Sequence, residues 1–257
     1  MEIIQKFKKN QFLFQELVHR DFTKKYKRTV LGIAWSVLSP LLSLLVMSLI
    51  FGTLLGSTIE HYTIYLFSGQ LIFSFFSDST NEGMTSLLNN AEIFTKINVP
   101  KYLFLFSKNI SALINFSITL GIYFLFVFAE GISFKWKFLL LLYPTACLII
   151  FNLGVGLILS ALYVFFRDIQ YLYSIFTLLL MYMSAIFYSI DTFPQIGKNL
   201  FLLNPIYVYI RYFRKIVIED MVPTVWFHLI ALGYALVVFG LGCWIYKKKN
   251  HSFLYYV

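Results

Sequence analysis

The chain has 257 residues, of which 59% are hydrophobic and 20% aromatic, whereas only 13% are charged. Soluble domains contain about 25% charged residues, so most of this surface must face something other than water. The formal net charge of +9 does not indicate nucleic-acid binding, because the basic residues cluster at the ends of apolar segments, as in membrane proteins. We therefore predict an all-α integral membrane protein that interacts with membrane lipids and not with nucleic acid.

The first segment, residues 1–29, is expected to form an amphipathic helix at the membrane interface. Its apolar residues recur at helical spacing, and most of its charged residues fall on other faces. Asp21 borders the apolar face, so the pattern is imperfect. The apolar face consists of Ile3, Phe7, Phe14, Val18 and Phe22.

Residues 30–257 are expected to form a transmembrane domain with six charge-poor spans, each near the roughly 20 residues that cross a bilayer. The second span is short and is expected to continue as a helix into the cytoplasm. Lys and Arg total 15 on one side and 6 on the other, which predicts that both termini are cytoplasmic. The predicted spans are about 30–55, 62–78, 103–128, 138–166, 169–190 and 225–246.

The outer segment 191–224 is too long and too apolar for an ordinary loop. Pro194, Pro205 and Pro223 divide it into stretches too short to span a bilayer. Such stretches suggest re-entrant helices that enter the outer leaflet and turn back, which requires protein or a water-filled cavity around them.

Active-site patterns are missing from the chain. It has no GxxxxGK[ST] phosphate-binding loop, and its four histidines show no metal-ligand spacing. Acidic residues are almost absent from the predicted spans, which argues against proton- or sodium-driven transport. We therefore expect no enzyme activity, metal or cofactor in this chain, and any uphill transport must be powered by a partner.

Four stretches in order resemble the type-2 ABC exporter permeases that secrete cell-surface polysaccharides such as O-antigen, capsule and teichoic acid. The first, from Arg20 to Leu41, fits R-D-F-x-x-[KR]-Y-[KR]-x-[ST]-x-L-G-x-x-W-x-x-L-x-P-L. The others are 97–101, 165–169, and 184–188 followed by 204–206. Ala185 stands where this family usually has proline.

The resemblance implies a homodimer of six-span subunits in the bacterial inner membrane. It also implies two copies of a separate nucleotide-binding subunit, which uses ATP and Mg²⁺ to move polyprenyl-linked polysaccharide outward. One alternative is a permease of the same fold that exports a drug or small lipid. A second is a membrane glycosyltransferase or polymerase, which needs clustered charged residues or histidines facing a cavity.

The resemblance also assigns a coupling helix to residues 81–101, with Glu92, Lys96, Pro100 and Lys101 at the contact with the ATPase. The alternative is a solvated loop. Arg167 and Asp168 lie in a short turn, where they either cap the two adjoining helices or form a salt bridge at the cytoplasmic rim, or make a second contact with the ATPase.

Two further sets of residues are candidates for substrate contact. The helix 1–29 is expected to act as a gate at the cytoplasmic mouth. Basic residues there serve as a topology signal and lipid anchor, or bind the pyrophosphate of a lipid-linked glycan; they are Lys24, Lys25, Lys27 and Arg28. Aromatic rings stack on sugars, although they also pack between helices and face lipid; the candidates for a glycan path are Phe73, Phe76, Tyr182 and Phe187.

Overall fold

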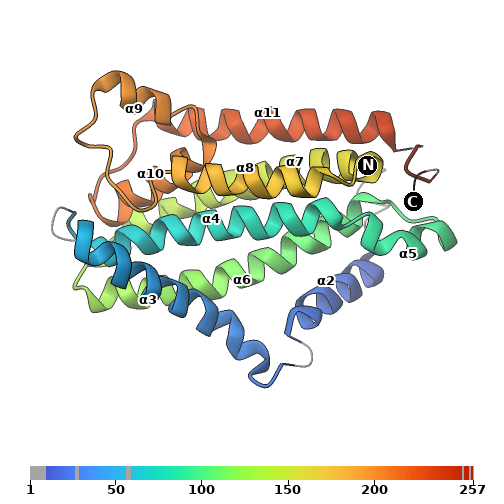
Figure 1. Ribbon diagram of the computed structural model, residues 1–257, viewed down its shortest axis with the longest axis horizontal. Coiled ribbons are helices and arrows are strands. Elements are labelled where there is room, and N and C mark those ends of the chain that lie inside the picture. The colour runs from blue at the N-terminus through green and yellow to red at the C-terminus, as the bar shows by residue number, and fades with distance from the viewer. Residues whose placement is uncertain (1–9, 27–28, 56–58, 251, 255, 257) are drawn as a thin grey trace.

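The computed structural model describes residues 10–26, 29–55, 59–250, 252–254 and 256, and within these residues it contains helices and no strand. Most helices run along one long axis, and the chain turns back at both ends of the bundle (Figure 1). The α-helices are α2 (Gln11–Tyr26), α3 (Trp35–Leu55), α4 (Tyr62–Thr85), α5 (Ala91–Lys96), α6 (Tyr102–Ala129), α7 (Leu142–Phe165), α8 (Ile169–Met183), α9 (Gln195–Phe201), α10 (Pro205–Val217) and α11 (Val225–Lys249).

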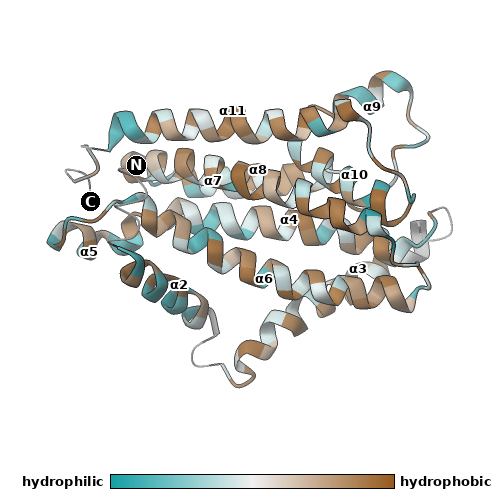
Figure 2. Cartoon of the chain, turned by 180° about the vertical axis from the view of Figure 1, so that it is seen from behind, coloured by the Kyte–Doolittle hydropathy of each residue, from teal (hydrophilic) through white to brown (hydrophobic). Residues whose placement is uncertain are grey.

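Four segments are long and apolar enough to cross a membrane, namely Gly32–Gly52, Tyr102–Ala129, Trp136–Phe165 and Val225–Lys249. They coincide with the first, third, fourth and sixth predicted spans. Hydrophilic residues gather on α2 and at the C-terminal end of α11, whereas the middle of the bundle is mainly hydrophobic (Figure 2). The protein is therefore an α-helical membrane protein with several spans.

The other two predicted spans are helices of a different kind. Helix α4 has 24 residues and more polar side chains, and it continues to Thr85 beyond the predicted span, as expected. Helix α8 has only 15 residues and ends at Met183 instead of near residue 190. The prediction for the end of the fifth span was therefore wrong.

Helix α8 ends early because the chain turns into a left-handed conformation. Ala185 has a φ of 49°, and a residue with a Cβ loses roughly 1–2 kcal/mol there. Proline, which is usual at this position in the resembling family, cannot adopt this φ because its ring holds φ near −65°. The break after α8 is thus made by a strained alanine.

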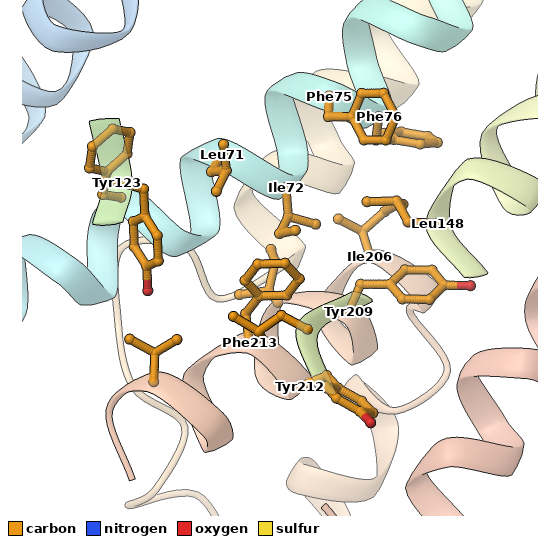
Figure 3. Close-up of a cluster of buried hydrophobic side chains, with 14 of the residues drawn as sticks. Leu71, Ile72, Phe75, Phe76, Tyr123, Leu148, Ile206, Tyr209, Tyr212 and Phe213 are labelled. Carbon is orange, nitrogen blue, oxygen red and sulfur yellow. The ribbon is translucent and has the colours of Figure 1, made fainter. Parts of the chain in front are cut away.

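The segment 191–224 forms two short helices, each beginning at or just after a proline. Pro194 precedes α9, and Pro205 is the first residue of α10. Ten of the 13 residues of α10 are buried. Figure 3 shows α10 side chains such as Tyr209 and Phe213 gathered with Ile72 of α4 in the core. Helix α10 is therefore enclosed by protein.

Helices α7 and α11 pack closely because glycines face each other. A Cβ added to Gly154 would lie 2.6 Å from the backbone nitrogen of Phe239. A Cβ added to Gly242 would lie 2.6 Å from the carbonyl oxygen of Gly154. Small residues of this kind allow two backbones in a membrane to approach each other.

Candidate functional site

Asp21 is the centre of an ion-pair network where α2 packs against α6. It is 4% exposed, and its carboxylate lies 2.7 Å from Arg20 Nη2 and 3.2 Å from Lys108 Nζ. Ser107 Oγ also donates a hydrogen bond to it at 3.0 Å. Arg20 also donates a hydrogen bond to Asn90 Oδ1 at 2.8 Å. The network therefore ties α2 both to α6 and to the turn that precedes α5.

Helix α2 lies within the predicted segment 1–29, but the side chains that it buries are not those of the predicted apolar face. Its most buried side chains are Leu17 and Asp21, which lie beside the predicted apolar face. Asp21, which borders the predicted apolar face, is therefore buried and holds α2 against α6 through its ion pair with Lys108. Of the predicted face, Phe14, Val18 and Phe22 are half-buried, and Ile3 and Phe7 lie outside the described residues.

The predicted basic cluster extends beyond the end of α2. Lys24 lies on α2 with its side chain exposed. The side chain of Lys25, together with Lys27 and Arg28, lies outside the described residues. The pyrophosphate site therefore stays a prediction, with only Lys24 placed at this end of the bundle.

Residues 81–101 are not one helix. Helix α4 ends at Thr85, a 3₁₀ turn spans Leu88–Asn90, and only Ala91–Lys96 form a separate helix. The chain breaks there because Asn90 donates from Nδ2 to the carbonyl oxygen of Ser86 at 2.7 Å, and side chains of this type favour turns over helix interiors. The buried ring of Phe94 holds α5 against the bundle, and Glu92 and Lys96 are exposed.

Lys101 joins the segment 81–101 to the residues that follow α11. Its Nζ donates to the carbonyl oxygen of Asn250 at 2.7 Å and lies 5.5 Å from the ring centroids of both Phe94 and Phe253. Burial lowers the pKa of the Lys101 ammonium. Pro100 before it is half-buried, so these two residues are less accessible than Glu92.

The turn between α7 and α8 lies at the same end of the bundle as α5 (Figure 1). Arg167 and Asp168 are both exposed, and Asp168 makes no side-chain capping bond to α8. Neither has a salt-bridge partner among the residues that the structure describes. The capping and salt-bridge interpretation is therefore not what the structure shows.

Two apolar side chains flank these charged residues. Phe166 is 65% exposed and Ile97 is 48% exposed, beside the predicted contact residues of the turn and of α5. Neither was among the predicted contact residues, although each lies in one of the four motif stretches and next to a charged residue. Exposed apolar side chains with polar neighbours are typical anchors of a protein interface.

The four aromatic candidates for a glycan path do not form one surface. Phe76 and Phe187 are buried in the core, Phe73 is half-buried, and only Tyr182 is exposed. Phe73 and Phe76 have ring centroids 6.3 Å apart, and those of Tyr182 and Phe187 are 6.0 Å apart. No ring contact in the described chain links one pair to the other.

A polar groove of about 450 Å³ lies between α3, α4 and α6. Sequence reasoning missed it, but the signal is visible in Ser36, Ser39 and Ser43, whose spacing places them on one face of α3. Hydroxyl groups aligned along one face of an apolar helix indicate that this face contacts polar side chains, water or a polar ligand and not lipid.

Arg214 of α10 is the second feature that sequence reasoning missed. It is 1% exposed and has no carboxylate within ion-pair distance in the described part of the chain. Its guanidinium donates to the carbonyl oxygens of Ala185 at 2.8 Å, Tyr65 at 3.0 Å and Ile186 at 3.1 Å. It also lies 3.4 Å from the centroid of the Tyr65 ring. Arg214 therefore supplies the hydrogen bonds that the break after α8 leaves unmade.

A sequence signal for Arg214 does exist. It lies four residues after Ile210 and eight after Ile206, and so on the apolar face of a short helix. Its neighbour Arg211 instead pairs with Glu219. Spacing alone therefore separates the buried arginine from the surface one.

Comparison with known proteins places this architecture in a family. A family model described as ABC-2 type transporter matches residues 12–218. The chain therefore belongs to the ABC-2 type transporter family, which is a family of transporter permease subunits.

Full-length relatives are named as polysaccharide exporters. One from Klebsiella pneumoniae, "O-antigen export system permease protein RfbA", is 28% identical over 248 residues, covering 94% of this chain and 95% of the relative. A Myxococcus xanthus protein of the same name is 26% identical over 245 residues, covering 94% of each chain. The Escherichia coli "Polysialic acid transport protein KpsM" is 22% identical over 255 residues, covering 96% of this chain and 97% of the relative.

Proposed function

We propose that this chain is the permease subunit of an ATP-driven exporter of lipid-linked polysaccharide. The observation that carries the proposal is similarity over nearly the whole chain to permeases named for O-antigen export. The exporter moves the glycan from the cytoplasmic to the outer side of the bacterial inner membrane. The chain itself is not an enzyme, since the partner ATPase uses ATP and Mg²⁺.

The proposed topology has six spans, with α4 as the second and α8 as the fifth. Both termini are then cytoplasmic, at the end of the bundle that carries α2 and the basic last turn of α11. Helices α9 and α10 are re-entrant at the outer side. The burial of α10 supports this assignment, because short helices at membrane depth need protein or a water-filled cavity around them.

The proposed assembly is a homodimer with two copies of the ATPase subunit. Helix α8 has a wide exposed apolar face that includes Leu172, Ile175 and Leu179. A face of this kind covers either lipid or a second copy of the chain. If this face packs against a second copy, Tyr182, which is also on α8, lies at the dimer interface and not in the core of one subunit.

The proposed ATPase contact consists of α5 and the turn between α7 and α8. Glu92 and Lys96 supply charges on α5, and Arg167 and Asp168 supply charges on the turn. Phe94 and Phe165 lie beneath them in one buried cluster with Phe253. A push on either element is therefore passed to the other through packed side chains, which are nearly incompressible.

The pyrophosphate of the lipid carrier is proposed to bind Lys24, Lys25, Lys27 and Arg28 at the cytoplasmic mouth. Arg and Lys complement a dianionic group. The network at Asp21 supports this role, because it holds α2 in a fixed position next to that run of basic residues.

The proposal is tested by deleting the gene and analysing the lipid-linked glycans of the cell. Full-length polymer that accumulates inside the cell supports export, and the wild-type gene restores surface polymer. Loss of polymer synthesis would instead indicate a glycosyltransferase or polymerase. An unchanged glycan profile with altered drug sensitivity would indicate a drug or lipid exporter and would refute the proposal.

A further inference from the structure

A small pocket lies between α9, α10 and the start of α11, at the end of the bundle opposite α5 (Figure 1). Its volume is about 150 Å³, below the roughly 300–1,000 Å³ of sites that enclose a drug-sized molecule, so it suits a small headgroup. All of its lining lies in the stretch 59–250, which the structure describes without a gap. We call it the α9–α10 pocket, and its lining includes Asp191, Lys198, Tyr207, Arg211, Lys215 and Phe227.

Three basic side chains from two helices meet at this pocket. The segment 191–224 carries four Lys or Arg residues, and one of them, Arg214, is bound to backbone carbonyl oxygens. The other three, Lys198 of α9 with Arg211 and Lys215 of α10, all line the pocket and are half-buried. Arg211 and Lys215 are four residues apart and share a helical face, where like charges are destabilising. An anion in the pocket relieves that repulsion.

The carboxylates near the pocket do not neutralise these basic side chains. Glu219 pairs with Arg211. Asp191 lines the pocket, but it forms no ion pair with any of the three basic residues. Neither Lys198 nor Lys215 has a carboxylate within ion-pair distance among the residues that the structure describes. Three positive charges therefore face two negative ones, and the two ammonium groups are available to an anionic ligand.

Tyr207 adds a hydrogen-bond donor to the wall of the same pocket. It is 4% exposed, and its hydroxyl makes no hydrogen bond within the described part of the chain. Its ring lies against that of Phe201, with centroids 5.4 Å apart, which limits the movement of the hydroxyl. Buried polar groups are normally satisfied by protein, water or ligand. A phosphoryl group has acceptor oxygens for this hydroxyl and for the lysines, and Arg and Lys are its usual partners.

The opposite face of α9 is apolar, which favours a lipid over free phosphate. Ile196, Leu200 and Leu203 recur at the spacing of one helical face, and all three are exposed. Lys198 falls on the other face, so α9 is amphipathic, with its basic side at the pocket. Trp226, exposed at the start of α11, is of a type enriched at membrane interfaces. Acyl chains can cover these apolar side chains while the headgroup enters the pocket.

We propose that the α9–α10 pocket binds the phosphoryl headgroup of a lipid, with Lys198, Lys215 and Tyr207 as its ligands. Its position at the outer leaflet rests on the topology of the proposed function, whereas the headgroup chemistry does not. Two kinds of lipid carry this chemistry, namely an ordinary anionic phospholipid and the polyprenyl pyrophosphate that carries the glycan. The experiment therefore compares both.

The first test measures lipid binding to the full-length chain, purified in a neutral detergent, by native mass spectrometry. Phosphatidylglycerol and polyprenyl pyrophosphate are the probes, and diacylglycerol and inorganic phosphate are the comparison ligands. Lys198→Gln and Lys215→Gln are each expected to raise the dissociation constant of at least one probe about tenfold, because each removes a charge-assisted hydrogen bond. Lys247→Gln is the matched control, because it removes an exposed charge at the far end of α11 and should change nothing.

The second test removes a single hydroxyl and leaves the charges in place. Tyr207→Phe keeps the ring that packs against Phe201, so the fold is retained. The dissociation constant of the same probe is expected to rise about threefold to tenfold, because a hydrogen bond to a charged group is lost. An unchanged dissociation constant in Tyr207→Phe would overturn the site as proposed.

The remaining outcomes identify the lipid or refute the proposal. Weaker binding of polyprenyl pyrophosphate alone would support a site for the carrier headgroup, and weaker binding of phosphatidylglycerol would support a site for a membrane lipid. Unchanged affinity of both lipids in the lysine variants, or an equal loss in Lys247→Gln, would overturn the proposal. Equally tight binding of diacylglycerol or of inorganic phosphate would also overturn it. The assay needs no glycan, so its failure and the failure of the gene-deletion test are distinguishable.

Discussion

Gly242 provides the sharpest test of the packing between α7 and α11. In Gly242→Ala, the new Cβ would lie 2.6 Å from the carbonyl oxygen of Gly154 and 3.1 Å from Cβ of Leu157. The first contact is roughly 0.8 Å closer than ordinary van der Waals contact, and a backbone oxygen cannot swing aside. The helices must separate, so we expect a loss of about 1–3 kcal/mol of stability, as for other overpacked cores.

The assay is the thermal midpoint of the purified protein in detergent, measured by size-exclusion chromatography after heating. A chain of this size loses about 2–4 °C per kcal/mol, so the change is measurable. Gly240→Ala is the control, because nothing lies within 4 Å of a Cβ at that position of the same helix. If both variants melt at the same temperature, the two backbones are not in contact at Gly242 and the reasoning is refuted.

Three further predictions concern single side chains. Ala185→Gly removes the strain of the 49° φ, so the free energy of unfolding should rise by about 1 kcal/mol and the thermal midpoint should rise with it. A lower midpoint would show that the left-handed turn is not formed. Asp21→Asn removes the carboxylate that pairs with half-buried Lys108, so hydrogen exchange of α2 should accelerate, whereas Lys24→Ala, on the exposed face, should leave it unchanged; equal exchange in both would contradict the network. Hydrogen bonds from Lys135 and Lys137 lower the pKa of Asp220. These bonds link the loop after α6 to the loop before α11. The link should therefore persist above the unfolded pKa of 3.8 and weaken as the pH falls through the lower folded pKa. The loop before α11 should then be cleaved faster by an acid-stable protease at low pH. If cleavage does not accelerate in acid, or is already maximal at neutral pH, the proposed role of Asp220 is contradicted.

Hydropathy predicted four of the spans well because it is a local property. An apolar run of about 20 residues must become a helix in a bilayer, since its backbone groups have no other hydrogen-bond partners there. The boundaries of α6 and α11 therefore follow closely from their sequences. Helix α8 was overestimated, because its end depends on a left-handed residue that hydropathy cannot detect.

The site was predicted less completely, because its contacts join residues far apart in the chain. Asp21 and Arg214 are charged residues, and charge by itself predicts a surface position, although helical spacing places Arg214 on the apolar face of α10. Both are buried because specific partners meet them: Lys108 and Ser107 at Asp21, and three carbonyl oxygens at Arg214. Burial of a charge is acceptable only with such partners, and no local pattern encodes them.

The sequence by itself determined that this protein is a multi-span membrane protein resembling the polysaccharide-exporting permeases. Composition, the position of basic residues and four short motifs are sufficient for that, since each is read along the chain. Only the tertiary structure decided that the segment 81–101 is broken and that α10 is enclosed in the core. It alone also showed that the polar faces of α3, α4 and α6 meet in one groove. The physical reason is that helical periodicity specifies which side chains share a face, whereas packing between helices decides what that face meets.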